Sequence, residues 1–179
     1  MHRIFAALPV PEPIADRLLP LCTDLHGARW RRRDHYHITL QFYGEVQREI
    51  AEEIATSLEA VRAPALALEL DGVGWFGRKE PRLVYARIAQ NDALSELAKD
   101  CRKIAQQLGL QIDTKPFKPH ITLAYCKETP LDAAREWSES FQLLQSQPFL
   151  IDRFHLYESF TSKNQQSRYQ QQADFHFAS

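Results

Sequence analysis

The sequence of 179 residues predicts a mixed α+β fold. Short apolar runs that end at Pro or Gly, typical of strands, alternate with segments whose apolar residues recur at helical spacing. No linker or low-complexity tract divides the chain. The block HITL occurs twice, at 37–40 and 120–123, each time within a predicted strand and nearly half the chain apart. We therefore expect one domain, residues 1–179, with two similar lobes that arose by internal duplication.

Four segments predict helices. The first begins near Pro13, and Pro20 is expected to kink or break it. The second covers 47–62 and has one apolar stripe. The third, 91–108, begins at a capping Asn91 and ends at Gly109. The fourth begins at "TPLD", where we expect Thr129 to cap the helix.

The remaining apolar or alternating runs predict strands, and the Gly-rich 71–77 between two of them reads as a turn. We expect Gly44 to end the first HITL strand. The predicted strands are 3–10, 35–43, 65–70, 82–89, 119–126, 149–159 and 167–177.

Composition narrows the class of protein. Hydrophobic residues make up 44% and the formal net charge is −1, so the chain is globular and does not coat nucleic acid. Three cysteines without a CxxC pair argue against a disulfide framework or zinc knuckle and suit a reducing compartment. No apolar run is long enough for a membrane helix, and the N-terminus does not resemble a signal peptide. We expect a soluble cytoplasmic protein.

Side chains alternate along a strand, so each HITL block has an apolar face of Ile and Leu and a polar face of His and Thr. A single block of this kind would be an ordinary half-exposed strand. Two copies facing each other across a groove supply a pair of imidazoles and a pair of hydroxyls. One imidazole can accept a proton while the other donates one, because the ordinary pKa of His, about 6.5, lies near working pH.

A metal site is the alternative for this part of the chain. His35 and His37 share a strand face, with Asp34 beside them. A catalytic zinc generally needs three protein ligands, and no HExxH motif supplies a third. We expect no metal, and we expect His35 to be a strand-edge residue.

With both blocks placed, the chain resembles the two-histidine phosphoesterase superfamily. Within it, the chain is most similar to the RNA 2′,3′-cyclic phosphodiesterases, also called 2′-5′ RNA ligases. The resemblance rests on "HITLQFYGEV", on "PFKPHITLAYC", and on the first and last strands, and it covers nearly the whole chain.

The resemblance implies a bilobal fold with antiparallel sheets lining a central cleft, and no cofactor. It implies hydrolysis of a terminal 2′,3′-cyclic phosphate to a 2′-phosphate, with 2′-5′ ligation as the reverse reaction. By analogy, His120 is the proton acceptor and His37 the proton donor, while Thr39 and Thr122 bind phosphate. Family members often carry Arg where this chain has Tyr125.

Further residues are candidate RNA contacts. Arg31 lies in a cluster of arginines, and Lys118 precedes the second block. Phe76 and Tyr43 are candidates for stacking on a base, whereas alternation assigns Phe42 to the core. Tyr125 is a candidate hydrogen-bond donor.

Two alternatives stay open. The same chemistry can act on ADP-ribose 1″,2″-cyclic phosphate or on 2′-5′-linked oligoadenylate, and a non-catalytic protein can bind RNA ends. The expected partners are RNA ends or nucleotides with a 2′,3′-cyclic phosphate. We expect a monomer without an obligatory protein partner and without a membrane.

Overall fold

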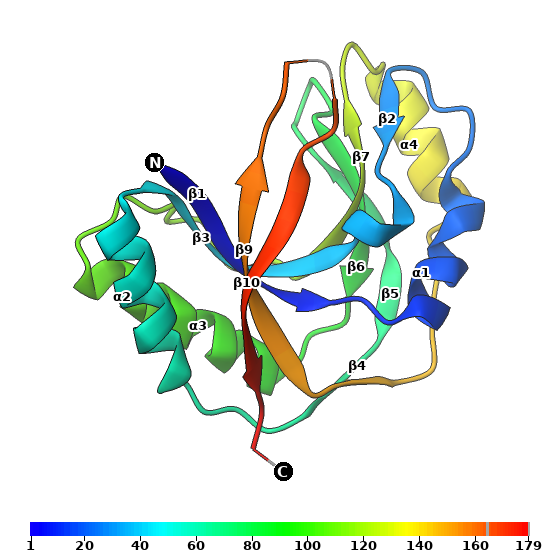
Figure 1. Ribbon diagram of the computed structural model, residues 1–179. Helices are drawn as coiled ribbons and strands as arrows, with labels where there is room; N and C mark the ends of the chain where they lie inside the picture. Colours follow the sequence, from blue (N-terminus) through cyan, green and yellow to red (C-terminus); the bar gives the residue numbers. More distant parts are fainter. Residues whose placement is uncertain (164, 179) are drawn as a thin grey trace.

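A computed structural model describes residues 1–163 and 165–178 and has the predicted α+β fold (Figure 1). Eight strands form one sheet in the order β10-β9-β1-β3-β7-β6-β5, with β2 also paired to β7. The pairs between these strands are antiparallel. The strands are β1 (His2–Pro9), β2 (Ala28–Trp30), β3 (His37–Val46), β5 (Leu70–Phe76), β6 (Leu83–Ile88), β7 (His120–Cys126), β9 (Arg153–Phe160) and β10 (Arg168–His176); β4 (Leu66–Leu68) and β8 (Phe149–Ile151) pair separately.

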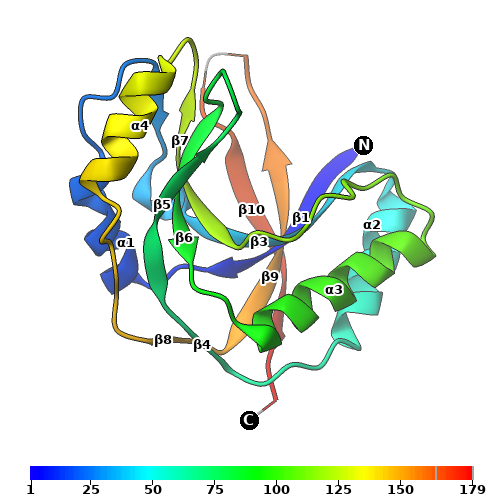
Figure 2. The ribbon, with the colours of Figure 1, turned by 180° about the vertical axis from the view of Figure 1, so that it is seen from behind.

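The helices cover the two halves of the sheet separately. Figures 1 and 2 show α2 and α3 together beside β1 and β3, whereas α1 and α4 lie at the other end of the molecule, near β5 and β7. The helices are α1 (Glu12–Leu18), α2 (Arg48–Glu59), α3 (Asp92–Gln107) and α4 (Leu131–Ser140), with 3₁₀ turns η1 (Leu19–Leu21) and η2 (Arg33–His35). Each helix buries its apolar face, as α3 does with Leu94, Leu97 and Cys101.

The two halves of the sheet meet at a narrow seam. Strands β3 and β7, which carry the two HITL blocks, pair at one position, Ile38 opposite Ile121. Strands β1, β9 and β10 continue the sheet on the β3 side, and β6 and β5 continue it on the β7 side. Because β9 and β10 come from the end of the chain and pair with β1, the halves are interleaved in sequence. They do not correspond to the N- and C-terminal halves.

Strand β3 is longer and less regular than its sequence predicts. It continues through Gly44, at φ +79°, to Val46, so the expected end at Gly44 is wrong. The register with β1 shifts twice, because neither Leu40 nor Tyr43 has a residue opposite it. Each extra residue is a β-bulge, which changes the face on which later side chains lie.

Several local predictions need correction. Residues 71–77, expected as a turn, mostly belong to β5, because Gly74 lets the strand pass close to the Tyr85 ring. Strand β2 was not predicted, because it lies in the Arg-rich segment, which has no alternating apolar pattern. Pro130, not Thr129, occupies the cap position of α4, and the Thr129 hydroxyl donates a hydrogen bond to the His26 carbonyl.

Other local predictions are confirmed. The Oδ1 atom of Asn91 accepts a hydrogen bond from the Leu94 amide and caps α3. Helix α1 gives way to η1 at Pro20, because proline cannot continue the helical hydrogen bonds. In the described part of the chain, no helix combines the length and apolar character needed to cross a membrane.

Candidate active site

At the seam, the two HITL blocks lie side by side on strands that run in opposite directions. Counting one residue each way from the Ile38–Ile121 pair, antiparallel pairing places His37 opposite Thr122 and Thr39 opposite His120. Residues opposite each other project to the same face, so all four polar side chains share one face. The two isoleucines are fully buried on the other face, while the four polar residues are partly exposed. A local two-fold axis through the seam relates the blocks.

Both imidazoles are held in the same way. The Nδ1 atom of His37 lies 2.8 Å from the His35 carbonyl oxygen, and Nδ1 of His120 lies 2.6 Å from the Lys118 carbonyl oxygen. A carbonyl only accepts, so Nδ1 carries the hydrogen in each ring. The neutral ring then has a free lone pair on Nε2, which is the nitrogen available for proton transfer.

Aromatic rings enclose His37. The rings of Phe5, Tyr157 and Tyr169, from β1, β9 and β10, lie with centroids 5.1, 6.4 and 5.2 Å from the imidazole. Tyr169 stands perpendicular to it. Burial among these rings, together with the charge of nearby Arg31, lowers the pKa of His37 to about 4. This imidazole is therefore neutral at neutral pH in the free protein.

His120 has a related but more open environment. The ring of Phe76 stands perpendicular to the imidazole at 5.0 Å, and Tyr85 lies at 5.2 Å. Burial lowers the pKa of His120, while its hydrogen bond to the Lys118 carbonyl opposes that shift. Both histidines thus start neutral, and an anionic ligand between them would favour the charged form of either.

A cavity of about 620 Å³ opens beside His120 and Thr39. Phe42 and Phe76 form part of its apolar wall, so Phe76 remains a candidate for stacking on a base. Its rim is basic, with the side chains of Arg82, Lys99, Arg102, Lys115 and Lys118 against the single carboxylate of Asp113. This arrangement suits a ligand that combines a flat ring with negative charge.

The predicted faces of Phe42 and Tyr43 are wrong. Phe42 is 54% exposed, whereas Tyr43 is 2% exposed and donates a hydrogen bond from its hydroxyl to the Cys101 carbonyl. The bulge at Leu40 reverses the alternation before this point, and the sequence pattern alone does not reveal a bulge. Tyr43 is therefore unavailable for RNA, and Phe42 is the site residue that the sequence reasoning missed.

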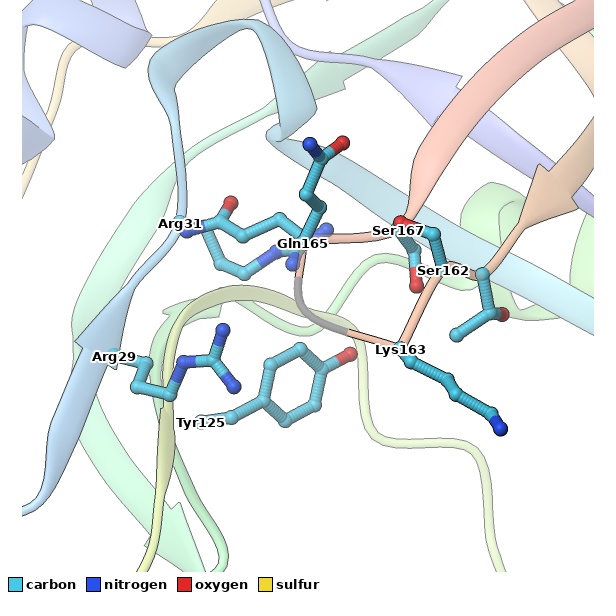
Figure 3. A pocket seen from close by; sticks show the side chains of 9 residues that line it. Arg29, Arg31, Tyr125, Ser162, Lys163, Gln165 and Ser167 are labelled. Atoms are coloured by element: carbon cyan, nitrogen blue, oxygen red, sulfur yellow. The ribbon is translucent and has the colours of Figure 1, made fainter.

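Arg31, which follows β2, and Tyr125 of β7 lie together next to a second cavity (Figure 3). The Arg31 guanidinium lies 5.3 Å from the centre of the Tyr125 ring and 5.5 Å from that of Tyr169. Two neighbouring arginines are engaged elsewhere, since Arg32 pairs with Asp34 and Arg33 with Asp16. Arg31 instead contacts Tyr169, one of the rings around His37.

The alternative of a metal site gains no support from the geometry. Among the described residues, no three His, Cys, Asp or Glu side chains gather in a way that would hold an ion. His35 lies in η2, not at the edge of a strand as predicted, and its Nδ1 is 3.3 Å from Nη2 of Arg31. An arginine at this distance repels a cation, which disfavours His35 as a metal ligand.

Comparison with known proteins places the chain in a family. Residues 10–161 match the model of the 2′-5′ RNA ligase superfamily. An RNA 2′,3′-cyclic phosphodiesterase of Thermotoga maritima is 30% identical over 166 residues, covering 88% of this chain and 86% of that protein. One of Geobacillus stearothermophilus is 37% identical over 98 residues, which span 53% of this chain but only 31% of the relative.

Solved structures show the same fold. The crystal structure of Escherichia coli LigT complexed with 3′-AMP superposes with a TM-score of 0.79 at 23% identity, covering 99% of both chains. The agreement extends over the interleaved halves and the seam between the HITL strands, since nearly every residue is matched. Together with the family match, it shows that the chain belongs to the 2′-5′ RNA ligase superfamily.

Proposed function

We propose that the chain is an RNA 2′,3′-cyclic phosphodiesterase, which opens a terminal 2′,3′-cyclic phosphate to a 2′-phosphate. The observation that carries this proposal is the symmetric pair of imidazoles, each with Nδ1–H bound to a carbonyl and Nε2 without a partner among the described residues. The name shared by the relatives supports the choice of substrate. The LigT complexes with 3′-AMP and ATP support a cleft suited to nucleotides.

His120 acts first, as the base. Its Nε2 takes a proton from a water molecule, and the water oxygen attacks phosphorus opposite the bond to O3′. The more open side of the seam, where the cavity of about 620 Å³ adjoins His120, gives water access to this position.

His37 completes the step as the acid. As the P–O3′ bond breaks, Nε2–H of the charged imidazole gives its proton to O3′, and the phosphate remains on O2′. The negative charge of the bound phosphodiester raises the low pKa of His37, which favours the proton-carrying form when substrate is present. The hydroxyls of Thr39 and Thr122 donate hydrogen bonds to the phosphoryl oxygens, where negative charge increases in the transition state.

The same groups can also catalyse ligation. When the 5′-hydroxyl of a second RNA replaces water beside His120, His120 takes the proton of that hydroxyl, its oxygen joins the phosphorus, and His37 again protonates the leaving O3′. The product is a 2′-5′ linkage, as the family description implies. Whether hydrolysis or ligation prevails then depends on how often a 5′-hydroxyl end, and not water, occupies the position beside His120.

Product analysis tests this function. An oligonucleotide with a 2′,3′-cyclic phosphate should yield only the 2′-phosphate, at an unchanged rate in EDTA, because the histidine pair supplies both acid and base. A 3′-phosphate product, or loss of turnover in EDTA, would contradict the mechanism. Competition with ADP-ribose 1″,2″-cyclic phosphate and 2′-5′-linked oligoadenylate ranks the substrates.

Two further proposals concern the setting of the reaction. The chain acts as a monomer, which light scattering at working concentration tests. It acts in the cytoplasm, where its three unpaired cysteines, Cys22, Cys101 and Cys126, would stay reduced.

A further inference from the structure

A second cavity, of about 330 Å³, lies between β2, β7 and the connection from β9 to β10. Its lining includes the side chains of Arg29, Arg31 and Tyr125 and the hydroxyl groups of Ser162 and Ser167. Figure 3 shows Arg29 of β2 and Arg31, just after it, on one side of the cavity and the serines on the other. Among the described lining residues there is no carboxylate, so the cavity is basic.

The buried residue of this cavity is Arg31. It is only 8% exposed, and in the described part of the chain no carboxylate pairs with it. Its Nη2 atom lies 2.8 Å from the Tyr169 hydroxyl and 3.3 Å from Nδ1 of His35, while its Nε and Nη1 atoms have no side-chain partner among the described residues. Neither atom is among the fully buried polar atoms that lack a partner, so both remain accessible from the cavity that Arg31 lines. A guanidinium with unused donors can bind an anion there.

Arg29 adds a second cation to the same face. The Arg31 amide continues the pairing of β2 with β7 by donating to the Leu123 carbonyl, so Arg29 and Arg31 share one face. Trp30 packs on the other side, 6.2 Å from the ring of Trp137. Arg29 pairs with Tyr125 across the strands, and its guanidinium points toward the tyrosine ring (Figure 3). Two guanidinium groups, each with several planar donors, match the oxygens of a phosphate.

The cavity is linked directly to the histidine pair. Arg31 holds the Tyr169 hydroxyl, and the Tyr169 ring stands edge-on to His37 at 5.2 Å. A phosphate held by Arg31 and Arg29 would thus lie beyond Tyr169 from the reacting phosphorus. A single strand of RNA places its next phosphate on the 5′ side of the reacting nucleotide.

We propose that Arg29, Arg31 and Tyr125 form a subsite for the phosphate on the 5′ side of the nucleotide that carries the cyclic phosphate. This proposal rests on the proposed function and specifies its substrate. The protein would favour RNA chains, or nucleotides with a 5′-phosphate, over nucleosides that carry the cyclic phosphate alone. Ser162 and Ser167 are additional donors for the same group.

Binding tests the subsite without any catalysis. We expect adenosine 5′-monophosphate to bind about tenfold tighter than adenosine in calorimetry, the scale of a hydrogen bond to a charged group. Arg29→Gln should remove most of that advantage, and Arg31→Gln should remove at least as much. Arg48→Gln is the matched control, because Arg48 lies on α2, pairs with Glu52 and lines neither cavity.

Thermal unfolding shows whether the Arg31→Gln variant still folds. If that variant does not fold, the Arg29→Gln variant alone tests the proposal, because Arg29 is exposed. Equal affinities for the two ligands would overturn the subsite. An unchanged affinity of the Arg29→Gln variant for adenosine 5′-monophosphate would also overturn the subsite, because the phosphate would then bind at the histidine pair instead.

Enzyme kinetics provide a second test of the subsite. Adenosine 2′,3′-cyclic phosphate with a 5′-phosphate should show a kcat/KM about tenfold above that of the same compound without it, and Arg29→Gln should lower only the former. Equal values for the two compounds in the unaltered protein would overturn the subsite. If neither compound is hydrolysed, the proposed function fails, and the binding measurements alone decide on the subsite.

Discussion

The two sides of the seam share a backbone plan and differ in their surroundings. Each HITL block presents His and Thr to one face and fixes its imidazole through the carbonyl two residues earlier. His37 is then packed among three rings and beside Arg31, whereas His120 meets two rings and an open cavity. A symmetric fold thus carries an asymmetric environment, which allows the two histidines to take different roles.

The largest effects are expected at the histidines themselves. Replacing His37 or His120 by Ala should each lower kcat by about 10²–10⁴-fold, since each variant loses one proton transfer. The double variant should be little slower than either single one, because the two rings act in one step. His176→Ala, which changes an exposed histidine on β10, is the control and should keep full activity. A single variant near the unaltered rate would remove that histidine from the mechanism.

The threonines test the symmetry of the phosphate contacts. Thr39→Val and Thr122→Val should each lower kcat by about 10²-fold, the size of losing one donor to a developing oxyanion. Valine keeps the shape and the strand preference, so unfolding temperatures should change little. A large effect at one threonine and none at the other would mean that the phosphate lies off the two-fold axis.

The pH dependence of the free energy of unfolding tests whether the surroundings of His37 keep its imidazole neutral. Because burial lowers the pKa of His37 to about 4, the unfolded chain binds a proton between about pH 6.5 and 4 that the folded chain does not. The free energy of unfolding should therefore fall as the pH is lowered through this window, by up to about 3 kcal/mol.

Denaturant titrations of the unaltered protein and of His37→Gln measure this contribution. The variant should show a flatter dependence on pH in the same window, with the His120 contribution remaining. Parallel curves for the two proteins would show that His37 is not held neutral by its surroundings.

The smallest effects separate Phe42 from Tyr43. Phe42→Ala should raise KM about tenfold, the scale of one base stacked on an aromatic ring, without lowering the unfolding temperature. Tyr43→Phe should leave the kinetics unchanged and destabilise the fold by about 1 kcal/mol, because it removes the buried hydrogen bond to the Cys101 carbonyl. The reverse pattern would mean that the bulges in β3 do not place these rings as described.

The fold class and the two His/Thr pairs could be predicted from local sequence patterns. Both HITL strands, the cap of α3 by Asn91 and the break at Pro20 were predictable, because each depends on neighbours in sequence. The surroundings of the site depend on register instead. The bulges at Leu40 and Tyr43 arise from pairing with β1, and the position of Arg31 depends on a short strand without apolar residues to mark it.

The interleaved halves have a consequence for how the protein is made. Two of the three rings around His37, Tyr157 and Tyr169, belong to β9 and β10, which the ribosome synthesises after both HITL blocks. A chain released before residue 153 would contain both HITL blocks and still lack most of the enclosure of His37. We therefore propose that residues 1–179 fold as one unit, slowly for its size, because so many contacts join distant parts of the chain.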